Sequence, residues 1–215
     1  MLISTSFLSS KNIPSDLTKL NETSTDYIHV DVMDGKFVKN KTMPFSEMKH
    51  IYKYTSKRLD VHLMVSNPEK YIDDYSTLNT EYITIHVEVL DNIDKCLNRI
   101  KSYGIKCGLA IKPDTPVREL VPYLPLLDLI LVMSVEPGEG GQEFIEGTAS
   151  KIEEVKCLLK EYNSQAKISV DGGVNFDTKK YCRKCDIMVS GSYIINSDDF
   201  EEKISSLRYN KKGDE

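Results

Sequence analysis

The stretch IHVDVMDGKFV, residues 28–38, begins as a buried β-strand and then becomes polar. Three β-branched residues alternate with other residues, which is the periodicity of a strand. His29 and Asp31 occupy the positions between them, and side chains two residues apart on a strand point to the same side. An imidazole and a carboxylate are costly to bury together unless a charge or hydrogen bonds compensate them. The stretch therefore predicts a strand that carries a functional pair of side chains.

Short β-branched apolar runs like this one recur along the chain. The eight runs are LISTSF (2–7), YIHVDVM (27–33), LDVHLMV (59–65), YITIHVEV (82–89), KCGLAI (106–111), DLILVMSV (128–135), KISV (167–170) and DIMVSG (186–191). Segments with helical capping or periodicity lie between several of them, namely SNPEKYIDDY (66–75), NIDKCLNRIKSYG (92–104), TPVRELVPYL (115–124) and KIEEVKCLLKEYN (151–163).

Strands that alternate with helices form a parallel sheet with right-handed crossovers, so the fold class is α/β. Eight such units favour a closed (β/α)8 barrel, the TIM barrel, as a single domain over residues 1–215. A doubly wound open sheet is the structural alternative. The polar residues 209–215 are expected to fray.

The composition is that of an ordinary globular protein, with 40% hydrophobic and 28% charged residues. The net charge of −5 is spread along the chain, which argues against nucleic acid as a partner. No apolar run approaches the ~20 residues that cross a bilayer, and the first residues lack the features of a signal peptide. Five cysteines without framework spacing indicate reduced thiols and a cytoplasmic protein. CRKC (182–185) is a lone CxxC element and is interpreted as incidental.

Functional side chains of a (β/α)8 barrel gather at the C-terminal ends of its strands. His29 and Asp31 lie near the end of the second run, His62 lies in the third, and Asp171 follows the seventh. Two histidines and two aspartates are suitable ligands for a divalent ion such as Zn²⁺, Fe²⁺ or Mn²⁺. A hydrogen-bonded core histidine is the alternative for His62, and His86 is interpreted as a polar residue that supports the site or the core.

Glycine-rich turns follow the sixth, seventh and eighth runs, at Gly140–Gly141, Gly172–Gly173 and Gly191–Ser192. Exposed backbone N–H groups at such turns form anion sites, and the loops after strands seven and eight are the usual phosphate site of these barrels. PGEGGQEF (137–144) is long enough to act as a lid over a substrate. Together the turns predict a phosphate-binding site.

Several of these segments resemble one known family. They are HVDVMDGKFVKN (29–40), DVHLMVSNPEKYI (60–72), LAIKPDTP (109–116), VEPGEGGQEFI (135–145), VDGGVN (170–175) and VSGSYI (189–194). In order and approximate spacing they resemble the ribulose-phosphate 3-epimerase family over residues 3 to about 195. The resemblance implies a ribulose-phosphate-binding TIM barrel, an isomerase of carbohydrate metabolism that interconverts D-ribulose 5-phosphate and D-xylulose 5-phosphate in the pentose phosphate pathway.

The resemblance also implies roles for individual residues. It implies one divalent metal ion (Zn, Fe, Mn or Co) held by His29, Asp31, His62 and Asp171. Asp31 and Asp171 are then also the catalytic acid/base pair. The residues implied to bind the substrate are Ser6, His62, Gly138, Glu139, Gly140, Gly141, Gly172, Gly173, Gly191 and Ser192. Those implied to line the pocket around the reacting carbons are Met33, Met64 and Met133.

The chain departs from the family pattern at four positions. Lys36 and Lys39 replace the His and Pro of DGHFVPN, Lys11 replaces an Asp, and Glu139 replaces the aromatic residue of PGFGGQ. These departures bear on lid closure and affinity, because the implied metal ligands are intact.

Three alternative functions remain open at this stage. One is 3-epimerisation of a six-carbon substrate, D-allulose 6-phosphate, by the same residues. Another is a sugar-phosphate-binding barrel whose catalysis has decayed. The third is the decarboxylase and aldol-lyase group, which is disfavoured because its Asp-x-Lys-x-x-Asp element is missing from residues 60–65. A homo-oligomer is possible in each case.

Overall fold

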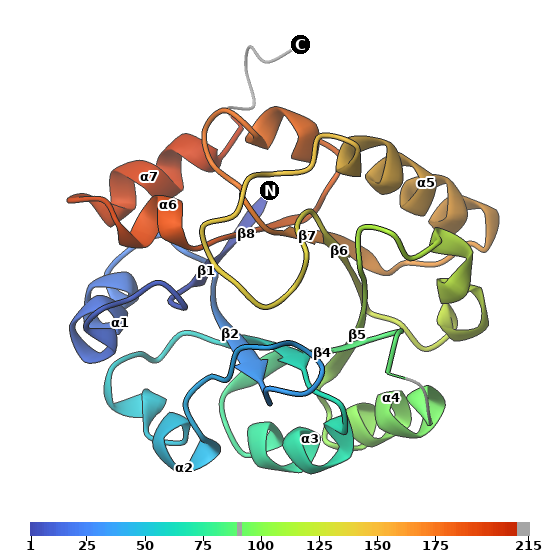
Figure 1. Ribbon diagram of the computed structural model, residues 1–215, viewed down its shortest axis with the longest axis horizontal. Helices are drawn as coiled ribbons and strands as arrows, with labels where there is room; N and C mark the ends of the chain where they lie inside the picture. The colour runs from blue at the N-terminus through green and yellow to red at the C-terminus, as the bar shows by residue number, and fades with distance from the viewer. Residues whose placement is uncertain (90–91, 210–215) are drawn as a thin grey trace.

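Eight parallel strands form a closed barrel in the order of the sequence (Figure 1). The computed structural model describes residues 1–89 and 92–209. The strands are β1 (Leu2–Ser6), β2 (Tyr27–Met33), β3 (Leu59–Met64), β4 (Thr80–His86), β5 (Lys106–Ile111), β6 (Leu129–Met133), β7 (Lys167–Asp171) and β8 (Ile187–Ser190). β1 pairs with β8, with Leu2 opposite Ile187. This pairing confirms the TIM barrel and excludes the open doubly wound sheet.

Helical segments follow the strands and surround the barrel (Figure 1). They are α1 (Ile13–Asn21), α2 (Phe45–Met48), η1 (Ile51–Lys53), α3 (Pro68–Ser76), α4 (Ile93–Ser102), η2 (Val117–Tyr123), α5 (Thr148–Glu161), η3 (Lys179–Cys182), α6 (Ser192–Ile195) and α7 (Phe200–Leu207). The largest apolar cluster joins the outward side chains of the strands to these helices, for example Val61 of β3 to Ile72 of α3. The helices at 66–75, 92–104 and 151–163 are confirmed within a few residues.

The helix predicted at residues 115–124 differs in type. The structure has the 3₁₀ helix η2 there. Pro122 lies inside it and has no N–H to donate, so an α-helical hydrogen-bond ladder cannot run through this position.

The barrel interior has two unlike sides, because alternate strand residues point inward. On the first four strands the inward positions are mainly polar, and we call this set the polar side: Ser4, Ser6, His29, Asp31, Asp60, His62, Thr84 and His86. On β5, β6 and β8 they form a compact apolar cluster, the apolar side: Ala110, Leu131, Met133 and Val189. β7 interrupts the apolar side with Ser169 and Asp171.

The C-terminal segment that was expected to fray is only partly described, because residues 210–215 lie outside the described part of the chain. The hydroxyl of Tyr209 donates a hydrogen bond to the carbonyl of Lys179. Among the described residues, no helix has the length and apolar character needed to traverse a membrane.

Candidate active site

Four predicted metal ligands meet inside the barrel near the C-terminal ends of the strands. His29 and Asp31 come from β2, His62 from β3 and Asp171 from β7. β2 and β3 pair in register so that Asp31 lies opposite His62. Each residue offers one ligand atom, and all four atoms lie within 4.8 Å of one another. Asp171 is distant from the other three residues in the sequence, and the closed barrel brings it next to them.

The spacing of these atoms fits a bound cation. Nε2 of His29 is 3.5 Å from Oδ1 of Asp31 and 3.7 Å from Oδ2 of Asp171. Nδ1 of His62 is 3.5 Å from each of the same two oxygens. Ligands about 2.1 Å from a tetrahedral zinc ion lie about 3.4 Å apart. Both nitrogens are buried and have no hydrogen-bond partner among the described residues, so a metal ion would satisfy them.

The electrostatics of the cluster also favour positive charge. Burial alone would lower the pKa of His29, but the carboxylates of Asp31 and Asp60 raise it well above its ordinary value. Burial would raise the pKa of Asp31, but the positive charge of His29 and contacts with His29 and His62 hold it below its ordinary range. The buried carboxylates thus require a cation, which is either a proton on histidine or a metal ion.

Buried polar groups behind the cluster hold its side chains in place. Nδ1 of His29 lies 2.9 Å from Oδ2 of Asp60, which also accepts a 2.8 Å hydrogen bond from the hydroxyl of Ser4. The hydroxyl of Ser6 donates to Oδ2 of Asp31 at 2.8 Å. The sequence analysis missed Asp60. Its signal is the spacing Asp60-x-His62, which matches the spacing of His29-x-Asp31.

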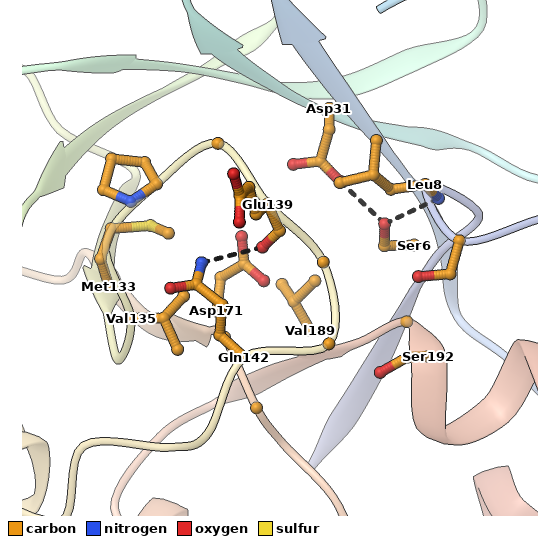
Figure 2. A pocket seen from close by; sticks show the side chains of 18 of the residues that line it. Ser6, Leu8, Asp31, Met133, Val135, Glu139, Gln142, Asp171, Val189 and Ser192 are labelled. Carbon is orange, nitrogen blue, oxygen red and sulfur yellow. Dashed lines mark hydrogen bonds between the residues drawn. The ribbon is translucent and has the colours of Figure 1, made fainter. Parts of the chain in front are cut away.

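A cavity opens above the cluster, at the mouth of the barrel. Figure 2 shows Asp31 beside Ser6 on one side of it and Asp171 beside the loop of Glu139 and Gln142 on the other. The predicted site residues that line it are Ser6, Asp31, Met33, Met64, Met133, Gly138, Glu139, Gly140, Gly141, Asp171, Gly172, Gly173, Gly191 and Ser192. His29 and His62 are fully buried beneath this lining.

Two glycines let the loop after β6 pack closely against the loops after β7 and β2. Gly173 has a φ of +61°, and a Cβ there would lie 2.6 Å from the backbone nitrogen of Phe144. Gly138 has a φ of +119°, and a Cβ there would lie 2.9 Å from the Cβ of Val38. The side-chain amide of Asn40 also donates to the carbonyl of Gly138 at 2.8 Å. Residues 137–144, the predicted lid, are thus in close contact with both the loop after β7 and the loop after β2.

The four departures from the family pattern lie in different places. Glu139 lines the cavity, whereas Lys11, Lys36 and Lys39 are exposed and are not part of its lining. Of the four departures, Glu139 is therefore the one whose side chain can directly affect what binds in the cavity.

Asp34, the second aspartate of the opening stretch, has a structural place. Its Oδ1 accepts hydrogen bonds from the backbone N–H groups of Lys36 and Phe37, and its Oδ2 accepts from the N–H and hydroxyl of Ser66. Burial would raise the pKa of Asp34, but these hydrogen bonds lower it to about 2. Asp34 therefore fixes the loop after β2 against the start of the loop after β3.

The CRKC element has no reactive character. Cys182 and Cys185 are both buried, and burial raises the pKa of Cys182 to about 12 and that of Cys185 further. Thiolates are the reactive and metal-binding form of cysteine, so these residues belong to the core.

Comparison with known proteins gives concordant results. A model of the ribulose-phosphate 3-epimerase family matches residues 2–195. The ribulose-phosphate 3-epimerase of Methanocaldococcus jannaschii is 36% identical, over 92% of this chain and 84% of that protein. The Bacillus subtilis enzyme of the same name is 34% identical over 92% of each chain.

Solved structures share the architecture at low sequence identity. The 3-hexulose-6-phosphate synthase of Salmonella typhimurium superposes with a TM-score of 0.69 at 17% identity, over 96% of both chains. A phosphoribosylanthranilate isomerase from Pyrococcus furiosus superposes with a TM-score of 0.62 at 12% identity. These likenesses support the barrel fold alone. On the family match and the relatives, this chain belongs to the ribulose-phosphate 3-epimerase family.

Proposed function

We propose that this chain interconverts D-ribulose 5-phosphate and D-xylulose 5-phosphate by epimerisation at C3. The observation that carries the proposal is the convergence of Asp31 and Asp171 on two buried histidine nitrogens that have no hydrogen-bond partner in the described part of the chain. His29, Asp31, His62 and Asp171 would hold one divalent ion of zinc, iron, manganese or cobalt. Family membership supports the choice of substrate.

Epimerisation at C3 of a 2-ketose removes a proton from one face of the carbon and returns a proton to the other face. The carbonyl at C2 makes the proton acidic, because it accepts the negative charge as an enediolate. A divalent metal ion in this site supplies a Lewis acid that stabilises this charge. Two acid/base groups on opposite faces are then required. Asp31 on β2 and Asp171 on β7 meet this requirement, since they enter the cavity from non-adjacent strands (Figure 2).

We assign both aspartates an acid/base role at C3, although their surroundings differ. The Asp31 side chain is 7% exposed and is oriented by the hydroxyl of Ser6, whereas the Asp171 side chain is 17% exposed. An aspartate with a solution pKa of about 3.9 is a weak base, so orientation must supply much of its effectiveness. Ser6 provides that orientation for one of the two groups.

The remaining lining residues are proposed to bind the rest of the substrate. Backbone N–H groups of the loops at Gly172–Gly173 and Gly191–Ser192 would bind the phosphate, and residues 138–141 would cover it. Met33, Met64 and Met133 would surround the reacting carbons with polarizable thioethers that offer no competing proton.

We also propose a cytoplasmic setting, which is supported by the cysteines. Cys96, Cys107, Cys182 and Cys185 are buried free thiols, and Cys157 is an exposed free thiol. Unpaired cysteines are typical of a reducing compartment. Formation of a homo-oligomer stays a prediction.

The test is proton NMR of D-ribulose 5-phosphate in D₂O with the purified protein, with added Zn²⁺ or Fe²⁺ and in parallel with a chelator. We expect loss of the C3–H signal and growth of the xylulose epimer, both abolished by the chelator. Exchange that continues in chelator would contradict the metal requirement. Turnover of D-allulose 6-phosphate in place of the pentulose would transfer the activity to the six-carbon substrate, and no exchange with either substrate would overturn the proposed activity.

A further inference from the structure

The two histidines of the cluster are held from behind in different ways. Nδ1 of His29 faces the carboxylate of Asp60 directly. Nε2 of His62 instead faces Nε2 of a second histidine, His86 on β4, at 2.8 Å. Nδ1 of His86 lies 3.0 Å from Oε2 of Glu88, just beyond the end of β4. His62 is therefore connected to a carboxylate only through an intervening imidazole.

The direction of this chain of hydrogen bonds is fixed at its outer end. Oε1 of Glu88 accepts a 2.8 Å hydrogen bond from the backbone N–H of Lys112 and another from the hydroxyl of Thr115. A backbone N–H can only donate, and an ionised carboxylate can only accept. Nδ1 of His86 must then carry the proton that it shares with Glu88. This leaves the Nε2 lone pair of His86 to accept a proton from Nε2 of His62.

The protonation states of the partners agree with this direction. Burial would raise the pKa of Glu88, but hydrogen bonds from His86, Thr115 and Lys112 lower it to about 2, so the group is a carboxylate near neutral pH. A neutral imidazole has one donor and one acceptor nitrogen, so His86 with its proton on Nδ1 offers an acceptor at Nε2.

Packing holds the His86 ring in the orientation that these hydrogen bonds require. The His62 and His86 ring centroids are 5.0 Å apart, which is about the nitrogen–nitrogen distance plus the two ring radii, so the rings meet edge to edge. Phe37 packs against His86 with a centroid separation of 4.7 Å, and Nζ of Lys112 lies 4.5 Å from the Phe37 ring centroid. The imidazole has little freedom to turn.

We propose that Glu88 and His86 are positioning residues that hold His62 as its Nε2–H tautomer and thereby direct the Nδ1 lone pair toward the metal ion. The inference rests on the metal site of the proposed function and deepens it. Partners of this kind set the tautomer and basicity of a ligating histidine. Here the donor is the backbone N–H of Lys112, just after β5. Its effect on the tautomer of His62 on β3 passes through two side chains, Glu88 and His86.

Glu88→Gln reverses the direction of the chain without changing its shape. The amide oxygen of Gln is expected to accept from the N–H of Lys112, since the amide nitrogen cannot. The amide NH₂ then donates to Nδ1 of His86, whose proton moves to Nε2. That proton points at Nε2 of His62 and forces the His62 proton onto Nδ1, the nitrogen required by the metal.

The experiment uses the full chain, from which metal is first removed and to which Zn²⁺ is then added. It measures the zinc affinity and the tautomer of His62. Chelator competition gives the zinc dissociation constant, and ¹⁵N NMR of the histidine rings shows which His62 nitrogen is protonated and which is coordinated. For Glu88→Gln we expect the dissociation constant to rise about 10- to 100-fold and the Nδ1-coordinated His62 signature to be lost. His86→Phe keeps a ring against Phe37 but removes the relay, and we expect about a 10-fold rise.

Two matched controls separate direction from packing. Thr115→Val removes one hydrogen bond to Glu88 but leaves the N–H of Lys112 and the direction unchanged, so the dissociation constant should stay within about 3-fold of the wild type. Glu201→Gln makes the same chemical change at a distant carboxylate that accepts two hydrogen bonds from Ser24, and it should leave zinc affinity unaltered.

The possible outcomes distinguish failure of the relay from failure of the proposed metal site. Wild-type affinity and an unchanged His62 signature in Glu88→Gln would overturn the inference, as would an equal loss in Thr115→Val. Failure of the wild type itself to bind zinc would remove the metal site on which both proposals rest. Zinc binding by the wild type together with unaffected variants would leave the proposed function intact and refute only the relay.

Discussion

The polar and apolar sides of the barrel interior share one strand geometry but depend on different physics. On the polar side each buried group needs a specific partner, as His29 needs Asp60 and Asp31 needs Ser6. On the apolar side Leu131 and Val189 need only neighbours of the right volume. Substitutions on the polar side should therefore change the chemistry, and substitutions on the apolar side should change the stability. Asp171 is the important exception, because β7 places a carboxylate of the His/Asp cluster next to apolar strands.

The largest effect is expected from Asp31→Asn and Asp171→Asn. Each substitution removes one positioned proton carrier and replaces a proposed carboxylate ligand with a neutral amide oxygen, so with saturating metal ion kcat for epimerisation should still fall by about 10²- to 10⁴-fold. Each variant should still exchange C3–H of one epimer with solvent deuterium, and the two variants should differ in which epimer exchanges. NMR of both pentulose phosphates in D₂O checks this. If both variants exchange the same epimer, the assignment of opposite faces is wrong.

Leu131→Ala should show the opposite behaviour. Leu131 is 1% exposed within the apolar side, and removing it should cost about 2–5 kcal/mol of unfolding free energy through lost burial and a residual cavity. Below the unfolding transition, zinc affinity should stay near that of the wild type. Urea unfolding and chelator competition on the same preparation measure the two quantities. A loss of zinc affinity without a loss of stability would contradict the division into two sides.

Gly173→Ala probes the loop after β7 at the point where it packs against the predicted lid, residues 137–144. The added Cβ would lie 2.6 Å from the nitrogen of Phe144, and a φ of +61° is unfavourable for alanine. The strain should displace the lid and raise KM for the phosphorylated substrate by about 10-fold, equivalent to about 1.4 kcal/mol, with a smaller effect on kcat. Gly141→Ala is the matched control, since its φ is +75° but no atom lies within 4 Å of its added Cβ. Equal effects from both would assign the change to backbone strain alone.

The smallest effect is expected from Asp34→Asn, which weakens the turn after β2. Loss of charge-assisted hydrogen bonds should cost about 1–2 kcal/mol of unfolding free energy at pH 7. Burial would raise the folded-state pKa of Asp34, but hydrogen bonds lower it to about 2. The ionised carboxylate therefore stabilises the fold at a pH above the ordinary aspartate pKa, and this stabilisation is lost as the pH falls from about 4 through 2. Urea unfolding of both proteins at pH 7 and pH 3 should show a smaller difference at pH 3. A difference independent of pH would exclude the charge as its source.

The strands and the convergence of the His/Asp cluster could be predicted because both have short periods in the sequence. Strands buried on both faces appear as apolar runs, and the pair His29-x-Asp31 stands out inside such a run. The predicted strand boundaries differ from the observed ones by only a few residues. The same i, i+2 spacing recurs as Asp60-x-His62 on β3 and as His86-x-Glu88 at the end of β4, and it is the signal that identifies the supporting residues.

Other features could not be predicted, because they depend on contacts between distant segments. The direction of the relay to His62 is set by the backbone N–H of Lys112, which no side-chain pattern encodes. The absence of an α-helix at η2 depends on Pro122, whose effect opposes the favourable start signal of Thr115 followed by Pro116. Helices α1 and α7 are short, and the patterns described above do not predict them.

Closure of the barrel through β1 and β8 has a consequence for the order of assembly. The pairing of Leu2 with Ile187 joins residues from nearly opposite ends of the sequence, and such contacts carry a large loop-closure cost and form slowly. The proposed metal ligands extend from β2 to β7, so the set of four is incomplete while the ribosome has released only the first half of the barrel. A metal ion bound to all four residues would therefore act as a lock on the finished ring and not as a template for its early folding.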